Sequence, residues 1–208
     1  MNKRHLTASA LLASALVLTA CGSDAGDTVS STSSGGSSGG SNGGSTAAET
    51  ATGNDADIAF LVGMKPHHEQ AVEMSEMVLA ANPPAEVAAI ARRVQAAQDP
   101  EIEQMEKMLA DLGEETGGTP HSGGHSAGMA GHGGMMSDAD MAALMDASGS
   151  DAARLYLEGM ILHHQGAIDA SDAQIADGQY APAVDLAKTI KTAQAAEITE
   201  MQALLQSL

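Results

Sequence analysis

Two short phrases of this sequence each place two adjacent histidines one helical turn after a methionine. The phrases are GMKPHHEQAVEMS at 63–75 and GMILHHQGAIDAS at 159–171. On a helix, residues three and four positions apart lie on one face. Imidazole nitrogen and thioether sulfur are ligands that select Cu(I), and by analogy Ag(I), over iron or magnesium. The candidate ligands on these two faces are Met64, His67, His68, Met160, His163 and His164.

A second shared phrase follows each of the first two, QDPEIEQM at 98–105 and QAAEITEM at 194–201. Its spacing places the glutamine, glutamate and methionine on one inward stripe of a helix. Buried Gln and Glu side chains are costly unless they bond polar partners, and imidazole N–H groups of the first helix are the obvious ones. A carboxylate that holds one ring nitrogen leaves the other free for a metal ion. These positions are Glu101, Met105, Glu197 and Met201.

The sequence leaves two points open at these positions. It does not decide whether each glutamate binds a metal ion directly or only orients a histidine. It also does not decide which histidine of each adjacent pair is the ligand, because the two rings flank the inward stripe on either side.

The elements that carry these residues form an internal repeat. A shift of 96 residues aligns 55–112 with 151–208 without a gap, and 19 of the 58 positions are identical. Each copy has the periodicity of a helical hairpin, with breaks at NPP (82–84) in the first copy and at Gly178 and Pro182 in the second. The sequence therefore predicts an all-α four-helix bundle over 54–208, with a linker at 113–150.

The linker contains a tract rich in histidine and methionine, HSGGHSAGMAGHGGMM at 121–136. A His-rich tract of small residues is a compositional signal of metal binding. The alternative is a solvated linker in which these residues have no function. The candidate ligands of the tract are His121, His125, Met129, His132, Met135 and Met136.

The N-terminal part of the chain has the features of an exported lipoprotein. Residues 1–20 combine a basic start with a short apolar run, which is typical of a signal peptide. The run ends in LTAC, which resembles a lipobox and implies lipid attachment to Cys21. Residues 21–53 are rich in Ser and Gly and predict a disordered tether. We therefore expect the domain on the outer face of the cell membrane or the periplasmic membrane face.

The composition excludes one class of partner. The chain has a net charge of −18, no Trp, two Tyr and one Phe. Nucleic-acid binding needs basic patches and stacking aromatic side chains, so this class has no support. An acidic surface favours solubility and attracts cations.

The histidine phrases at 63–75 and 159–171, with the partner phrases at 98–105 and 194–201, resemble the DUF305 family. This resemblance implies a ferritin-like four-helix bundle in an exported bacterial protein that binds copper. It covers 55–112 and 151–208, and it implies metal sites at the positions named above in both copies. Lys65 departs from the family, in which an aliphatic residue such as Ile161 is common at this position.

We therefore expect a protein that binds Cu(I), or Ag(I), for copper sequestration, transfer or resistance, and that is not an enzyme. Its partners are metal ions and the membrane, and the sequence identifies no copper-handling partner protein. One alternative is a metal-dependent oxidase, although Met64 and Met160 stand where di-iron bundles place a carboxylate. Another is a bundle without metal, structural or pH-sensing, in which the histidines form a buried polar network.

Overall fold

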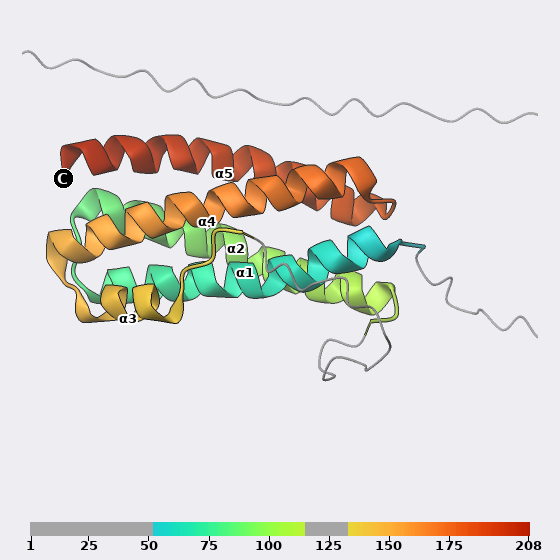
Figure 1. The fold of residues 1–208 in the computed structure, drawn as a ribbon, viewed down its shortest axis with the longest axis horizontal. Coiled ribbons are helices and arrows are strands. Elements are labelled where there is room, and N and C mark those ends of the chain that lie inside the picture. The colour runs from blue at the N-terminus through green and yellow to red at the C-terminus, as the bar shows by residue number, and fades with distance from the viewer. Residues whose placement is uncertain (1–51, 115–132) are drawn as a thin grey trace, which may run out of the picture. The chain divides into compact units, whose positions relative to one another are not determined.

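The computed structural model describes residues 52–114 and 133–208, which form five helices and no strand within these ranges (Figure 1). The predicted all-α class is therefore confirmed. The four long helices match the two predicted hairpins, and a short helix lies within the predicted linker. The helices are α1 (Asp55–Ala80), α2 (Ala85–Asp111), α3 (Asp138–Asp146), α4 (Gly149–Asp177) and α5 (Ala181–Ser207).

The helix ends follow from local chemistry. Asn54 and Asp57 form a reciprocal capping box at the start of α1, which satisfies backbone N–H groups that a helix leaves free. Asn82 has a φ of 53° directly after α1, and Pro84 precedes α2. A left-handed residue followed by proline ends one helix and starts the next. None of the helices in the described ranges combines the length and the hydropathy that a membrane span requires.

The four long helices pack as neighbouring antiparallel pairs. The α1–α2 and α4–α5 hairpins each pair their own helices, and α1 against α4 joins the two hairpins. Helices α2 and α5 also pack together, and α1 makes a smaller contact with α5. The arrangement relates the two hairpins by an approximate twofold axis, because the second copy repeats the residues of the first.

The apolar core is divided into two clusters of buried side chains, and each cluster draws on all four long helices. The Met160 cluster consists of Ala71, Met74, Val78, Val87, Ile90, Ala91, Val94, Leu144, Ala152, Ala153, Tyr156, Leu157, Met160 and Met201. The Met64 cluster consists of Phe60, Leu61, Met64, Met105, Leu109, Ala167, Ala183, Leu186, Ala187 and Ile190. Adding or subtracting 96 converts most positions of one cluster into positions of the other.

The two clusters lie on opposite sides of the histidine layer, which we define as His67, His68, His163 and His164. Along α1, the Met64 cluster ends at Met64 and the Met160 cluster begins at Ala71. Along α4 the order is reversed, with Met160 before the histidines and Ala167 after them. The sequence phrases therefore mark the middle of the bundle.

A buried carboxylate closes the end of the bundle next to the Met64 cluster. Asp57 is fully buried and accepts hydrogen bonds from Gln174 Nε2 at 2.6 Å and from the backbone N–H of Tyr180 at 3.0 Å. It also accepts from the backbone N–H groups of Asn54 and Gln179. Burial raises the pKa of Asp57, but these hydrogen bonds outweigh it and lower the pKa below its usual value. Asp57 thus ties α1 to the α4–α5 turn.

We predict that Asp57→Asn lowers the free energy of unfolding by about 2 to 4 kcal/mol at neutral pH, because buried N–H groups lose a charged acceptor. The pKa of Asp57 is lower in the folded state, so its stabilisation is present above the unfolded pKa and disappears as the pH falls through the folded pKa. Denaturant unfolding at several pH values measures this. The matched control is Asp55→Asn, on the exposed side of the same turn. An equal loss of unfolding free energy in both variants would contradict the proposed role of Asp57 in tying α1 to the α4–α5 turn.

Candidate functional site

The histidine layer brings the two copies of the sequence motif into contact. All four imidazoles have no solvent exposure. The rings of His67 and His163 lie with their centroids 3.7 Å apart and their planes tilted by 39°. These two residues are equivalent in the repeat, so their contact lies on the approximate twofold axis. The first histidine of each pair therefore faces the other copy.

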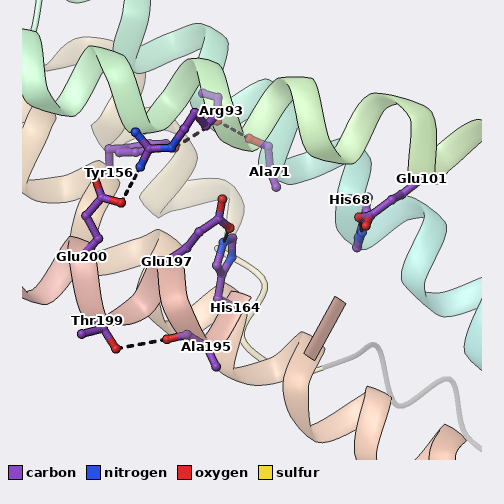
Figure 2. A network of polar contacts seen from close by, with 11 residues as sticks. His68, Ala71, Arg93, Glu101, Tyr156, His164, Ala195, Glu197, Thr199 and Glu200 are labelled. Atoms are coloured by element: carbon purple, nitrogen blue, oxygen red, sulfur yellow. Dashed lines mark hydrogen bonds and ion pairs between the residues drawn. The ribbon is translucent and has the colours of Figure 1, made fainter. Parts of the chain in front are cut away.

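The second histidine of each pair is held by a glutamate of its own hairpin. His68 Nε2 lies 2.9 Å from Glu101 Oε2, and His164 Nε2 lies 2.8 Å from Glu197 Oε2. Figure 2 shows each ring pointing from its helix toward the glutamate of the neighbouring helix. The predicted partnership between imidazole and glutamate is therefore confirmed in both copies, at the same pair of atoms.

This contact fixes which ring nitrogen is available. A carboxylate accepts hydrogen bonds, so Nε2 of each ring carries the hydrogen. In the neutral ring, Nδ1 then keeps its lone pair, as in histidines that bind metal ions while a carboxylate orients them. Nδ1 of His68 and of His164 makes no hydrogen bond to any residue that the structure describes.

Further buried polar atoms accumulate around the layer. The side-chain amides of Gln98 and Gln194 are almost fully buried, one turn before the glutamates, and neither bonds any of the described residues. The prediction that imidazoles satisfy these two glutamines was therefore wrong. Buried polar groups without partners cost about 1 to 3 kcal/mol each, and such a concentration is typical of a site that takes a ligand or water.

The interior of the layer favours uncharged imidazole. Burial lowers the pKa of His163 well below its usual value, and the neighbouring His67, His164 and His68 lower it further. A neutral ring presents lone pairs to a metal ion without first releasing a proton.

The predicted methionine ligands flank the layer on both sides. Met64 and Met105 belong to one apolar cluster, and Met160 and Met201 belong to the other. All four are fully buried. Within the described residues, no three His, Cys, Asp or Glu side chains converge as they would around a metal ion.

The predicted ligands of the His/Met tract lie partly outside the described residues, namely His121, His125, Met129 and His132. Met135 and Met136 are described. The Met135 side chain is 41% exposed, and Met136 packs against the Met160 cluster. The structure therefore brings the end of the tract onto the bundle beside α4.

Sequence reasoning missed the residues that hold this end of the tract. The Gln70 side chain bonds the backbone of Met136 at both its N–H and its carbonyl, at 2.8 and 3.0 Å. Gly166, the counterpart of Gln70 in the second copy, lies against the backbone of Gly133. The sequence holds no clear signal for this contact, because Gln70 and Gly166 are one of seven differing pairs among the thirteen positions of the two phrases.

The fold and the layer define a class, namely four-helix bundles built from two repeated hairpins with a buried core of histidine and methionine. Residues 57–205 match the family described as Domain of unknown function (DUF305), and the chain belongs to this family. The predicted family is therefore confirmed. No match was found among curated protein sequences.

Solved structures of the same family share this fold. A DUF305 fragment from Deinococcus radiodurans is 30% identical with a TM-score of 0.65, and the match covers 74% of this chain and 98% of that one. A DUF305 protein from Streptomyces coelicolor, described as secreted, is 28% identical with a TM-score of 0.65, covering 73% and 91%. CopM in its Cu(I)-bound form is 25% identical with a TM-score of 0.59, covering 73% and 96%. CopM also has solved Cu(II)-bound and Ag-bound forms.

We predict that His68 and His164 are both Nε2–H tautomers in the metal-free protein, because each Nε2 donates to a carboxylate. Replacing the acceptor by Glu101→Ala should remove this preference from His68 and leave His164 unchanged. Long-range ¹H–¹⁵N NMR spectra of the two rings measure the tautomers. His164 serves as the control within the same molecule. An Nδ1–H tautomer at both rings of the unmodified protein would contradict the assignment of Nδ1 as the free ligand atom.

Proposed function

We propose that this protein binds Cu(I), or Ag(I), as cargo in the middle of the bundle, and that it serves copper sequestration, transfer or resistance. The observation that carries the proposal is the pair of buried imidazoles, His68 and His164. Each is oriented by a glutamate at Nε2 and has Nδ1 without a hydrogen bond among the described residues. Oriented imidazoles of this kind are typical of metal ligands.

The donor set supports a soft monovalent ion. Methionine stands one turn before each histidine pair, and Met105 and Met201 lie in the same apolar clusters as these methionines. Thioether and imidazole together suit Cu(I), and neither is lost by disulfide formation in an oxidising compartment. Bound forms of CopM with Cu(I) and Ag support the same choice of metal at the level of the family.

The role that we propose is binding rather than catalysis. A di-iron oxidase needs carboxylates that bridge two metal ions. In this bundle, Glu101 and Glu197 each bond a histidine of their own hairpin. Methionine replaces the carboxylate that such enzymes place one turn before the histidine.

We further propose that the bundle works outside the cytoplasm, held at a membrane by lipid on Cys21. The apolar run before Cys21 and the Ser/Gly-rich segment after it support this location. The described secretion of the Streptomyces coelicolor relative is consistent with export. The acidic net charge of −18 would draw cations toward a domain at such a surface.

The metal proposal predicts that leucine at the four buried methionines weakens Cu(I) binding by at least about a hundredfold. Removing a residue that only orients a metal ligand typically lowers metal affinity by about 10 to 100 times, and removing the ligands themselves should lower it further. The variant carries Met64→Leu, Met105→Leu, Met160→Leu and Met201→Leu. Leucine keeps the volume of methionine, so we expect the variant to fold. Competition with a Cu(I) chelator measures affinity, and thermal unfolding of the metal-free protein measures folding.

The matched control for this prediction is Met74→Leu, which replaces a fully buried methionine of the Met160 cluster that is not one of the predicted ligands. Its Cu(I) affinity should equal that of the unmodified protein. A quadruple variant that folds and binds Cu(I) with unchanged affinity would refute the proposed site.

The location predicts that Cys21→Ala moves the protein from the membrane fraction to the soluble fraction of cells that express it, because two acyl chains hold a protein at a bilayer far more firmly than its surface charge does. Cys21 is the only cysteine of the chain, so metabolic labelling with a radioactive fatty acid reports this position alone. Labelling that persists in the variant, or a variant that stays with the membranes, would contradict the anchor.

A further inference from the structure

The segment that we call the strap, residues 133–136, is the described end of the His/Met tract, and it is seated on the bundle by matched features of α1 and α4. A Cβ at Gly166 would lie 1.4 Å from the carbonyl oxygen of Gly133. A Cβ at Gly134, whose φ is 94°, would lie 2.2 Å from the carbonyl oxygen of Leu162. Only glycine allows backbones to approach this closely. The strap therefore has a built seat on the helix that carries His163.

The other side of the seat is a side-chain amide. Gln70 Oε1 accepts from the Met136 N–H at 2.8 Å, and Gln70 Nε2 donates to the Met136 carbonyl at 3.0 Å. Gln70 and Gly166 are equivalent positions of the repeat, two residues after the second histidine of each pair. The same repeat position therefore has two different roles. Gln70 on α1 bonds the strap, and Gly166 on α4 leaves space for the strap backbone.

The two methionines of the strap differ in burial. Met135 is 41% exposed, whereas Met136 is partly buried against the Met160 cluster. A Cβ at Gly159 would lie 2.7 Å from Met136 Sδ, so this sulfur rests on the backbone next to the fully buried Met160. Of the two methionines, Met136 is therefore the one that contacts the cluster containing Met160.

A cavity open to solvent lies beside these two methionines. Its volume is 230 Å³, and Met135 and Met136 line it together with the acidic residues Asp140 and Glu158. Asp140 already accepts a hydrogen bond from Ser137 Oγ at 2.7 Å, and Glu158 is exposed on α4. Carboxylates at a concave surface raise the local concentration of cations, and thioethers select soft ones.

We propose that this cavity is an entry site for a soft monovalent cation, bound by Met135 and Met136, and that ions pass from Met136 to Met160. The proposal rests on the function proposed above, since it supplies the route to the buried site. It also distinguishes the two copies, because Met136 packs against the Met160 cluster and, within the described residues, not against the Met64 cluster. Ions therefore load the Met160 side of the histidine layer first.

The test compares the rate and the equilibrium of Ag(I) uptake by the full-length mature protein, because Ag(I) needs no reductant. Met135→Leu with Met136→Leu keeps the apolar packing but removes both sulfurs. We expect the rate of Ag(I) transfer from a chelator, followed by stopped flow, to fall by at least about tenfold, while the equilibrium affinity changes less than about twofold. The matched control is Met145→Leu, a 64% exposed methionine on α3, whose rate should not change.

A second variant tests the seat without touching any sulfur. Gly166→Ala places a Cβ where the Gly133 backbone lies and should displace the strap, so Ag(I) uptake should slow while the affinity of the buried site is kept. An unchanged rate in the methionine variant would overturn the entry site. Faster uptake in Gly166→Ala would also overturn it, because the strap would then be an obstacle.

Methyl NMR spectra separate failure of this proposal from failure of the buried site. In the variant that carries leucine at Met64, Met105, Met160 and Met201, Ag(I) should still shift the methyl resonances of Met135 and Met136. If Ag(I) shifts the Met135 and Met136 resonances of this variant, and the variant binds Ag(I) as tightly as the unmodified protein, the buried site is refuted and the entry site is kept. Resonances of Met135 and Met136 that ignore Ag(I) would refute the entry site, whatever the buried site does.

Discussion

The burial of four imidazoles in the middle of an apolar bundle is the constraint on which the structure depends. Neutral imidazole and amide groups cost free energy in such a place unless they bond something. Two glutamates at the edge of the core offset this cost, because each reaches inward to Nε2 of one histidine. Within the described residues, the side-chain amides of Gln98 and Gln194 and Nδ1 of His68 and of His164 make no hydrogen bond. The two apolar clusters on either side keep the four helices together across this weak point.

The duplicated frame is symmetric where the histidines lie and asymmetric elsewhere. Asp57 and Gln174 bond each other at one end of the bundle, whereas their counterparts, Ala153 and Val78, are apolar members of the Met160 cluster. Tyr156 bonds Ser75 at 3.1 Å, whereas its counterpart Phe60 has no hydroxyl group to offer. The two copies thus share the histidines, glutamates and methionines of the motif, whereas other positions of the bundle differ.

The sequence predicted the fold because the repeat doubled every signal. The helix bounds, the inward stripe and the pairing of Glu101 with His68 all follow from spacing. It did not predict the short helix α3, which lies in a segment of mostly small residues with a weak pattern. It also did not predict that His67 and His163 touch, because the packing of one hairpin on the other is a tertiary property. The seat of the strap depends on backbone contacts at Gly166, which no periodicity reports.

The composition of the two apolar clusters has a consequence for the origin of this chain. Each cluster takes residues from both hairpins, so one hairpin alone completes neither of them. A single hairpin would bury its apolar face only by pairing with a second copy of itself. The axis through His67 and His163 is where such a pair would have been symmetric. The bundle therefore has the arrangement of a homodimer whose two hairpins are joined in one chain, and the strap, with Met136 packed against the Met160 cluster, distinguishes its two sides.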